Sequence, residues 1–325
     1  MRLLTFLVIT LAASLALATG FGETPLAAAQ YAQALAHPAS APGEILWRLR
    51  LPRAVAAAVV GGELGLAGAV MQGLLRNPLA DPGVLGVSAF AALGAAAVIA
   101  LGLAGAPGAV ELAAMAGALG AGAIVAILAA RLREPETLIL FGVALSALGG
   151  AATALVFNLS PSPITTSEVM NWLLGSTAGR GWGDVATAAI PTVIGAGLCA
   201  YAARGLSMLS LGEETAALSG LPMARLRAAA VAGAALLTGA AVAMAGVIGF
   251  VGLAAPHLVR GSVSDDPAKT LAPSAVVGAI LLVLADLAAR MIPTSEELKL
   301  GVVTALLGAP LFALLAWRAA RSWRR

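Results

Sequence analysis

The residues Arg50-Leu51-Pro52-Arg53 open the stretch that decides the fold class, an apolar run from Ala54 to Leu75 that ends in the turn Asn77-Pro78-Leu79-Ala80-Asp81-Pro82-Gly83. A membrane-spanning helix needs about 20 predominantly apolar residues, and this run supplies them. Lipid solvation does not require an asparagine, an aspartate and two prolines in so short a turn. The stretch therefore predicts a transmembrane helix whose following turn has a function of its own.

The composition of the whole chain is typical of a membrane protein. Of 325 residues, 60% are hydrophobic and 11% are charged, and the mean hydropathy is +0.96, whereas soluble domains carry about 25% charged residues. Only helices and closed barrels satisfy their backbone hydrogen bonds in lipid, and the long, non-alternating apolar runs predict helices. The single cysteine, Cys199, excludes an intrachain disulfide and argues against a cysteine-based metal site. We expect an all-α polytopic membrane protein, with residues 1–325 forming a single transmembrane domain.

Hydropathy predicts about ten membrane passages. Nine of them are distinct apolar runs: Leu3–Gly20, Ala54–Leu75, Gly83–Leu103, Ala109–Ala130, Leu138–Asn158, Val185–Ala203, Ala228–Met244, Leu271–Ala289 and Gly301–Trp317. The tenth falls between Ala245 and Gly261, where several glycines and Pro256 leave room only for a short or re-entrant segment. Non-helical backbone at that depth has to be buried in protein or to line a cavity.

Positive charges predict the orientation, because cytoplasmic loops carry an excess of Lys and Arg. If both termini are cytoplasmic, 13 of the 19 basic residues lie inside. The remaining six, outside, are Arg48, Arg50, Arg53, Arg180, Arg290 and Lys299. Ala16-Leu17-Ala18 resembles a signal-peptide cleavage site, but an uncleaved first helix is favoured because it gives an even number of passages.

A weak internal repeat divides the chain. Gly142-Val143 and Leu148-Gly149 recur 159 residues later as Gly301-Val302 and Leu307-Gly308. Many transporters are built from inverted repeats, with the pathway near the repeat interface. Chance matching in a chain rich in Ala, Gly and Leu is the alternative. The repeat predicts halves of approximately residues 50–158 and 225–319.

The longest loop on the predicted cytoplasmic side is residues 205–227. Ser210 is a candidate cap for a short helix, with Glu213 completing a capping box, and Gly220 and Pro222 would end that helix. Two short amphipathic helices with a hinge suit docking in a groove of a partner protein. An ordinary surface loop is the alternative, and the pattern favours neither.

The chain lacks the common motif for ATP hydrolysis. A P-loop ends in Gly-Lys-Ser/Thr, whereas the two lysines of this chain, Lys269 and Lys299, follow Ala268 and Leu298. The chain therefore does not hydrolyse ATP by that route. If it pumps, the energy comes from a partner or from an ion gradient.

Gradient-driven carriers place ionisable groups within the membrane, and Glu63 and Asp286 are the candidates here. One acid without a partner makes a poor relay, so a satisfied buried acid is favoured for Glu63 over a proton or substrate ligand. Asp286 precedes Arg290 by one turn, which predicts an i, i+4 ion pair.

Taken in order, the motifs resemble the FecCD-type permeases of binding-protein-dependent ABC importers for iron-siderophore complexes, haem and vitamin B12. The resemblance extends from Leu46 to Ala320, and no single motif would be specific. It rests on Arg50-Leu51-Pro52-Arg53, Met71-Gln72, Asn77-Pro78-Leu79-Ala80-Asp81-Pro82-Gly83, Leu211-Gly212-Glu213-Glu214-Thr215-Ala216, Gly249-Phe250-Val251-Gly252-Leu253 with Pro256-His257, and Gly301-Val302-Val303-Thr304-Ala305 with Gly308-Ala309-Pro310.

The resemblance implies a vitamin B12 importer permease-like fold of ten transmembrane helices, in the bacterial inner membrane with both termini cytoplasmic. It implies a homodimer in the lipid bilayer that works with two ATP-binding subunits and a periplasmic substrate-binding protein, and no nucleic-acid partner. It implies a chain with no catalytic residue, no metal site and no cofactor of its own, since ATP and magnesium bind to the partner ATPase.

The resemblance also implies three sets of site residues. Arg50, Arg53 and Arg290 would form an outer basic patch that pairs with acidic residues of the binding protein. The helices that couple to the ATPase would contain Leu211, Gly212, Glu213, Glu214, Thr215, Ala216 and Gly220. The cytoplasmic gates would contain Asn77 and Leu79, and Glu134, Pro135, Glu136 and Thr137. The pathway would follow the dimer axis, lined partly by Leu138–Asn158 and Gly301–Trp317.

Two positions depart from the family pattern: Glu63 replaces a residue that is usually small, and Lys299 replaces a proline after Glu297-Leu298. The cargo stays open, with a ferric siderophore or related metal chelate expected and haem or cobalamin as alternatives. A proton-coupled secondary carrier that uses Glu63, or a receptor without transport, is the alternative from another class.

Overall fold

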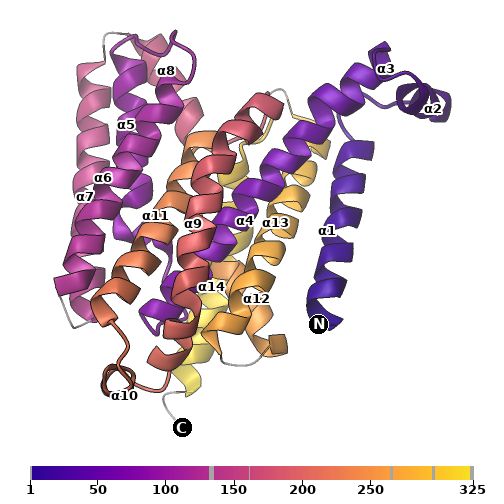
Figure 1. The fold of residues 1–325 in the computed structure, drawn as a ribbon. Coiled ribbons are helices and arrows are strands. Elements are labelled where there is room, and N and C mark those ends of the chain that lie inside the picture. The colour runs from indigo at the N-terminus through magenta and orange to yellow at the C-terminus, as the bar shows by residue number, and fades with distance from the viewer. Residues whose placement is uncertain (1, 132–134, 161, 264–265, 295–296, 323–325) are drawn as a thin grey trace.

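The computed structural model describes residues 2–131, 135–160, 162–263, 266–294 and 297–322, and in these ranges the chain is a bundle of helices (Figure 1). The all-α prediction is confirmed. The helices are α1 (Arg2–Gly20), α2 (Ala28–Ala36), α3 (Ala41–Glu44), a π-helical turn (Ile45–Arg50), α4 (Leu51–Leu74), a 3-10 turn (Pro82–Leu85), α5 (Val87–Ala100), α6 (Ala109–Arg131), α7 (Pro135–Leu159), α8 (Pro163–Leu173), α9 (Trp182–Leu209), α10 (Glu213–Leu218), α11 (Met223–Ala245), α12 (Val251–Val263), α13 (Pro267–Met291) and α14 (Leu300–Ser322).

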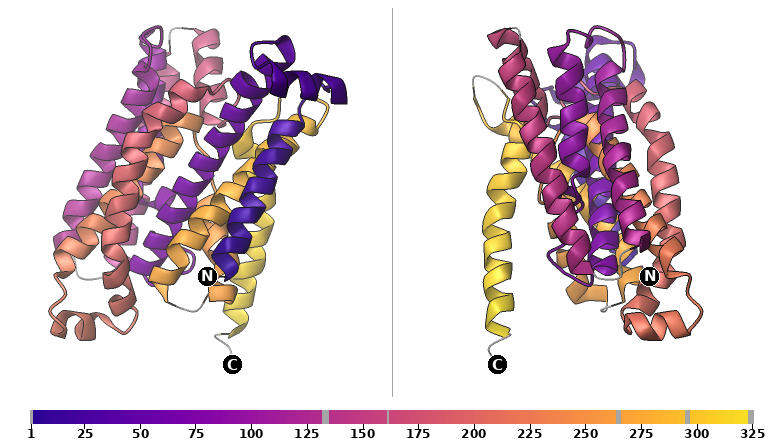
Figure 2. Two further views of the ribbon diagram at one scale, coloured as in Figure 1. Left: turned by 45° about the vertical axis from the view of Figure 1, so that its right-hand side comes forward. Right: turned by 90° about the vertical axis from the view of Figure 1, so that its left-hand side faces the viewer.

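The two ends of the bundle differ in what covers them. The short helix α10 lies at the end where α1 begins and α14 finishes, whereas α2, α3 and α8 lie at the opposite end (Figures 1 and 2). The chain thus starts and finishes at one end, as the expected even number of passages requires. We call the end with α10 the inner end and the other the outer end.

Seven helices among the described residues are long and apolar enough to cross a membrane: α1, the continuous helix Ala41–Leu74, α6, α7, α9, α11 and α13. α5 and the part of α14 from Leu300 to Leu314 are shorter apolar stretches, and α12 has 13 residues. The ten passages expected from hydropathy correspond to these seven and these three. The third predicted passage, Gly83–Leu103, is too long, because Asp81 caps a 3-10 turn and Gly86, at φ +81°, separates that turn from α5.

The short outer helices were not expected, because hydropathy detects only segments of membrane length. Each of two begins with a serine cap and a proline in the first turn. The Ser40 hydroxyl accepts from the Gly43 N–H at 3.3 Å, and the Ser162 hydroxyl accepts from the Thr165 N–H at 3.2 Å. The Ser-x-x capping pattern with an early proline was the available signal.

Helix α4 forms the centre of the bundle, because its glycines let other helices approach its backbone. A Cβ atom at Gly61 would lie 2.2 Å from the Gly278 carbonyl oxygen, and one at Gly65 would lie 2.3 Å from that of Ser274. The spacing of four residues puts both glycines on one face of α4, against the matching small residues of α13. One turn later, a Cβ atom at Gly68 would lie 1.8 Å from the Gly252 carbonyl oxygen of α12.

The predicted break between Ala245 and Gly261 is confirmed as an interruption between α11 and the short helix α12. Gly246 and Phe250 both have positive φ, at 71° and 67°. The segment is held by backbone groups of the loop after α8: the Ser176 N–H donates to the Ala245 carbonyl at 2.8 Å. The same loop accepts from the start of α14, where the Leu300 N–H donates to the Gly175 carbonyl at 2.9 Å. The non-helical backbone is thus partly buried in protein and partly lines a pocket at Gly249, the two environments that its polar groups allow.

Candidate functional site

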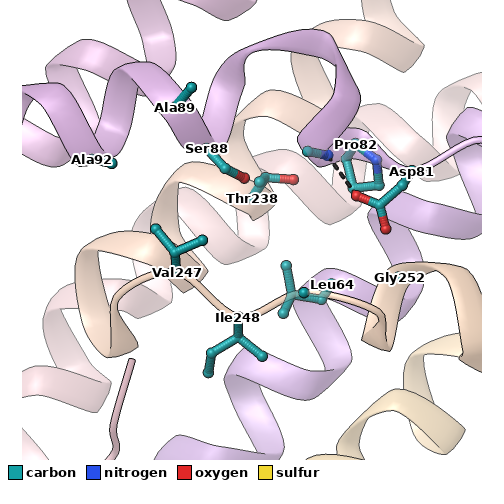
Figure 3. A pocket seen from close by; sticks show the side chains of 12 residues that line it. Leu64, Asp81, Pro82, Ser88, Ala89, Ala92, Thr238, Val247, Ile248 and Gly252 are labelled. Carbon is teal, nitrogen blue, oxygen red and sulfur yellow. Dashed lines mark hydrogen bonds between the residues drawn. The ribbon is translucent and has the colours of Figure 1, made fainter. Parts of the chain in front are cut away.

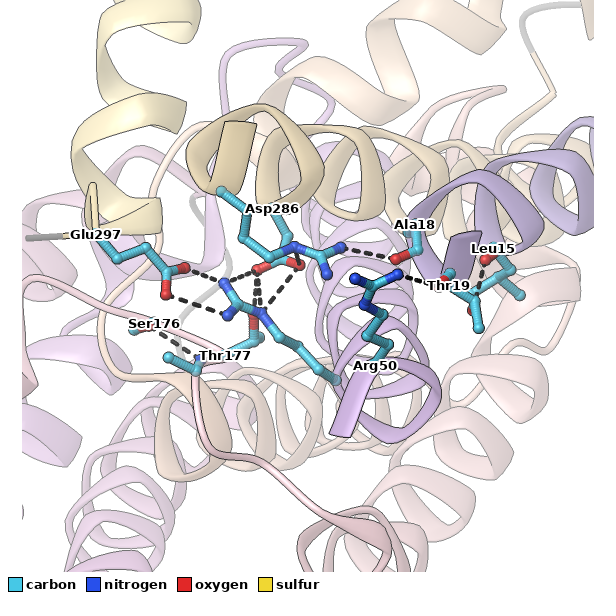
Figure 4. A network of polar contacts seen from close by, with 11 residues as sticks. Leu15, Ala18, Thr19, Arg50, Ser176, Thr177, Asp286 and Glu297 are labelled. Atoms are coloured by element: carbon cyan, nitrogen blue, oxygen red, sulfur yellow. Dashed lines mark hydrogen bonds and ion pairs between the residues drawn. The ribbon is translucent and has the colours of Figure 1, made fainter. Parts of the chain in front are cut away.

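Arg53 and Asp286 form the centre of a polar cluster at the outer end, although 233 residues separate them. The Arg53 guanidinium donates to Asp286 at 2.8 and 3.0 Å and to Glu297 at 3.1 Å. Asp286 is fully buried and also accepts from the Thr177 hydroxyl at 2.7 Å. It forms an ion pair with Arg290 at 3.2 Å, so the predicted i, i+4 pair is present. One carboxylate therefore joins α4, α13 and the loop before α9 (Figure 4).

Arg50 and Arg290 bind the C-terminal end of α1. Arg50 donates to the carbonyls of Gly20, at 3.0 Å, and Thr24, and Arg290 donates to that of Ala18 at 3.1 Å. The last carbonyls of a helix lack intrahelical partners and carry partial negative charge, so arginines stabilise them. These contacts pack the end of α1 against the outer ends of α4 and α13.

The three arginines expected to dock a binding protein thus lie together, but they do not project from the surface. Arg50 is 6% exposed and Arg290 is 7% exposed, and Arg53 has two carboxylate partners. Arg48, on the π-helical turn, is the exposed neighbour, and its side chain pairs with Glu44 at 3.3 Å. All four arginines border one outer hollow of about 300 Å³. Sequence reasoning missed Glu297 and Thr177 as members of the cluster.

A second pocket, of about 330 Å³, lies where α4, α5 and α11 meet the break before α12. Ser88, Thr238 and Asp81 lie along one side of it, and Val247 and Ile248 of the break lie along the other (Figure 3). Asp81 accepts from the Gly83 N–H at 2.7 Å, whereas the buried Thr238 hydroxyl has no hydrogen-bond partner in the part of the chain that the structure describes. The rest of the pocket lining is mostly apolar.

The residues of the first expected gate form a turn at the inner end of α4. The Asn77 side chain accepts from the Leu79 N–H at 2.9 Å, and both residues are half-buried. In the second expected gate, Glu134 lies outside the described residues and Pro135 begins α7, where Glu136 is exposed and Thr137 half-buried.

The expected coupling loop contains one short helix, α10. One leucine just before this helix and one at its end are exposed to solvent. The side chains of Leu211 and Leu218 are 74% and 84% exposed. Gly212, at φ +112°, opens the helix, and Gly220, at φ +79°, ends it as predicted, since the Leu221 N–H donates to the Ala216 carbonyl at 3.3 Å. Thr215 lies in the middle of the helix.

Ion pairing joins α10 to the next helix. Glu213, in the first turn of α10, pairs with Arg227 of α11, whereas its neighbour Glu214 is exposed. The ion pair holds α10 in place, with Ala216 buried beneath it and Leu218 in solvent.

The expected cap of α10 is wrong. Ser210 does not begin this helix but ends α9, and its hydroxyl donates to the Ser207 carbonyl at 2.7 Å. Gly212 is the N-cap instead. One helix, and not the two expected, lies between α9 and α11, because α9 continues to Leu209 and includes the first part of the expected loop.

Glu63 is buried between α4 and α9. The Thr192 hydroxyl donates to one of its carboxyl oxygens, and this hydroxyl also lies 2.6 Å from the Ala188 carbonyl oxygen. The second carboxyl oxygen has no partner among the described residues. In those ranges no second ionisable residue forms a hydrogen bond or an ion pair with Glu63. The same ranges hold no group of three His, Cys, Asp or Glu side chains that could bind a metal.

Comparison with known proteins extends over almost the whole chain. The model of the FecCD transport family matches residues 7–318. The vitamin B12 import system permease proteins BtuC of Salmonella typhimurium and Salmonella typhi are 42% identical over 286 residues, which cover 87% of this chain and 86% of theirs. The corresponding protein of Salmonella arizonae is 41% identical over the same length.

A solved structure has the same fold. It is described as an inward-facing conformation of a metal-chelate type ABC transporter, and it superimposes with a TM-score of 0.87 at 29% sequence identity. The match covers 98% of this chain and 99% of the solved one.

Proposed function

Since the chain belongs to the FecCD transport family and is the permease subunit of an ABC importer rather than an enzyme, we propose that its cargo is cobalamin. The observation that carries the proposal is the identity of 42% over 87% of the chain with vitamin B12 import permeases. It favours the cobalamin alternative over the ferric siderophore that was first expected. The metal-chelate transporter of the same fold is compatible with either cargo, because cobalamin is itself a cobalt chelate.

Membership of an ABC importer also argues against the alternative function, a proton-coupled secondary carrier that uses Glu63. An importer of this class takes its energy from ATP on a partner subunit, so no proton-coupled step by Glu63 is required. The side chain is instead a polar contact between α4 and α9.

The functional unit is a homodimer with both termini in the cytoplasm of a bacterial cell, so that the inner end of the bundle faces the cytoplasm. Helices α7 and α14 supply the faces that meet around the pathway. Their large exposed apolar side chains support this role, among them Leu140 and Leu148 of α7 and Leu306 and Leu307 of α14.

Helix α10 is the contact with the ATPase, which holds ATP and magnesium. Exposed leucines on a short helix fit an apolar groove in a partner protein, and the Glu213–Arg227 ion pair transmits a displacement of α10 to α11. Rigid-body movement of α11 would then reach the break before α12 and the second pocket, which α11 borders. Asn77, Leu79 and residues 134–137 would gate the inner end in this cycle.

A periplasmic binding protein docks on the outer end. Arg50, Arg53 and Arg290 form the basic floor of that surface, and Arg48 is its exposed rim. Because the Arg48 side chain is 72% exposed whereas that of Arg53 is 12% exposed, an acidic side chain of the binding protein would approach Arg48 first. Electrostatic complementarity of this kind mainly raises the association rate and sets the register.

The test of the cargo is uptake in a strain that lacks this chain, measured in parallel with labelled cobalamin, haem and ferric siderophores. Loss of cobalamin uptake alone, restored by the intact chain, is the expected result. The Gly212→Pro variant should not restore it, because Gly212 has φ +112° and proline is confined to about −65°. Loss of siderophore or haem uptake with cobalamin uptake unchanged would refute the cargo assignment.

A further inference from the structure

The inner end of α4 holds an arginine in a strained backbone conformation. Arg76 follows the C-cap Leu75 and has φ +47°, and the Asn77 N–H donates to the Gln72 carbonyl at 3.2 Å. This is the Schellman ending of a helix, whose left-handed position is usually glycine. A residue with a Cβ atom is disfavoured in that conformation, because the Cβ crowds the following carbonyl oxygen. A strained non-glycine residue is a reason to look for a function of its side chain.

Arg76 borders a pocket of about 230 Å³ with a second arginine, Arg260 of α12. The Arg260 guanidinium donates to the Gln72 side-chain oxygen at 3.0 Å, and Gln72 is only 2% exposed. The buried amide thus fixes Arg260 at the wall of the pocket. Within the residues that the structure describes, Arg76 has neither an ion pair nor a hydrogen bond from its guanidinium, so its donors are available to a ligand.

The hydroxyls of the pocket act as acceptors. The Ser210 hydroxyl donates to the Ser207 carbonyl, and the Thr270 hydroxyl donates to the Pro267 carbonyl, each at 2.7 Å. Because a hydroxyl has one proton and two lone pairs, both remain able to accept a hydrogen bond. The pocket therefore combines guanidinium donors for an anion with acceptors for a hydroxylated group beside that anion.

The acidic residue nearest in sequence to the pocket wall is already engaged. Asp266 precedes Pro267, which lines the pocket, and its carboxylate accepts from the Ser207 hydroxyl and from the Ala268 N–H at 3.1 Å. It also pairs with Lys269 at 3.6 Å. These three partners engage the Asp266 carboxylate, and it forms no ion pair with Arg76 in the part of the chain that the structure describes.

We propose that this pocket binds the headgroup of an anionic phospholipid, with the phosphodiester on Arg76 and Arg260 and the headgroup hydroxyls on Ser210 and Thr270. The pocket lies at the ends of membrane helices: α4 finishes at Leu74 and α13 starts at Pro267. Headgroups occupy this level, just beyond a hydrocarbon core of about 30 Å. Basic pockets between helix ends at the cytoplasmic surface suit anionic headgroups. A carboxylate of the ATPase would use the arginines but not the hydroxyl acceptors.

The test uses the full-length protein in nanodiscs that contain equal amounts of phosphatidylglycerol and phosphatidylcholine. The lipids that stay bound after transfer to detergent are counted by native mass spectrometry. The expected result is a preference for phosphatidylglycerol that falls at least about tenfold in Arg76→Gln. Arg76→Lys should keep part of the preference, and the exposed Arg204→Gln, on the same end of α9, should keep all of it. Circular dichroism and gel filtration verify that the variants fold.

Four outcomes decide whether the anion is a lipid headgroup, a free anion or a partner carboxylate. Retention of phosphatidylglycerol that excess inorganic phosphate does not displace supports the lipid headgroup, whereas displacement by phosphate alone would assign the site to a free anion. An equal lipid preference in the wild-type protein and Arg76→Gln would overturn the proposal. So would unselective lipid binding combined with loss of ATPase affinity in Arg76→Gln, which would assign the pocket to a partner carboxylate. None of these readouts depends on the cargo.

Discussion

Replacing Asp286 with alanine tests the outer polar cluster most directly. The carboxylate is fully buried and faces two guanidiniums whose side chains are only 12% and 4% exposed, those of Arg53 and Arg290. Removing one partner of a buried ion pair costs about 3–5 kcal/mol, because an uncompensated charge remains in a medium of low polarity. Glu297 still neutralises Arg53, and the Ala18 carbonyl still accepts from Arg290. The loss should therefore lie near the lower bound, about 3 kcal/mol.

Equilibrium unfolding in mixed micelles measures this loss. A change of about 3 kcal/mol corresponds to roughly a hundredfold change in the unfolding equilibrium constant. Glu44→Ala is the matched control, since its ion pair with Arg48 is 42% and 72% exposed and should contribute no more than about 1 kcal/mol. Added salt should reduce the control effect much more than that of Asp286→Ala. Equal free-energy losses in the two variants would refute the argument that burial makes this cluster strong.

Three further changes test other parts of the structure. Gly68→Ala should lower the free energy of unfolding by about 3 kcal/mol or more and abolish the yield of folded protein, because its Cβ atom would lie 1.8 Å from a carbonyl oxygen of α12. Gly62→Ala is the control: its Cβ atom meets nothing closer than 3.5 Å, so it should be neutral or stabilising in the same expression assay. Gly220→Ala, at φ +79°, should lower the free energy of unfolding by about 1 kcal/mol and reduce the amount of cargo transported per ATP hydrolysed, measured in proteoliposomes. An unchanged ratio would mean that α10 does not couple ATP hydrolysis to transport. The hydrogen bond from Ser207 holds the pKa of Asp266 below its ordinary value. The stabilisation that this carboxylate contributes is therefore present at neutral pH and declines below about pH 4, as the pH falls through the lowered pKa. Asp266→Asn should lower the unfolding midpoint more at pH 7 than at pH 3, and an equal loss at both would contradict this assignment.

Hydropathy predicted the membrane helices well because the requirement for about 20 apolar residues is a property of single segments. It failed for α5, where the capped turn at Asp81 replaces the first residues of the expected helix. It also could not detect α2, α3 and α8, which are 9, 4 and 11 residues long. The internal repeat stays a prediction.

Only part of the polar cluster could be predicted from the sequence. The Asp286–Arg290 pair is local and follows from helical spacing, whereas the Arg53–Asp286 contact joins residues that no local rule connects. The resemblance to a family named the three arginines. It did not indicate their burial, which depends on how α1 and the loop after α8 close over them.

The arginines of the outer end also set an order of events during synthesis. Arg53 is made 233 residues before Asp286, and Ala18 is made 272 residues before Arg290. At about 5–20 residues per second, α4 waits some 10–50 s in the membrane before its counter-charge emerges from the ribosome. During that time the helix bears a positive charge near its outer end that holds it at the headgroup level. The last-made helices complete the protein by neutralising its first-made ones, so a chain truncated before α13 would leave Arg53 without Asp286 and Glu297, its two carboxylate partners.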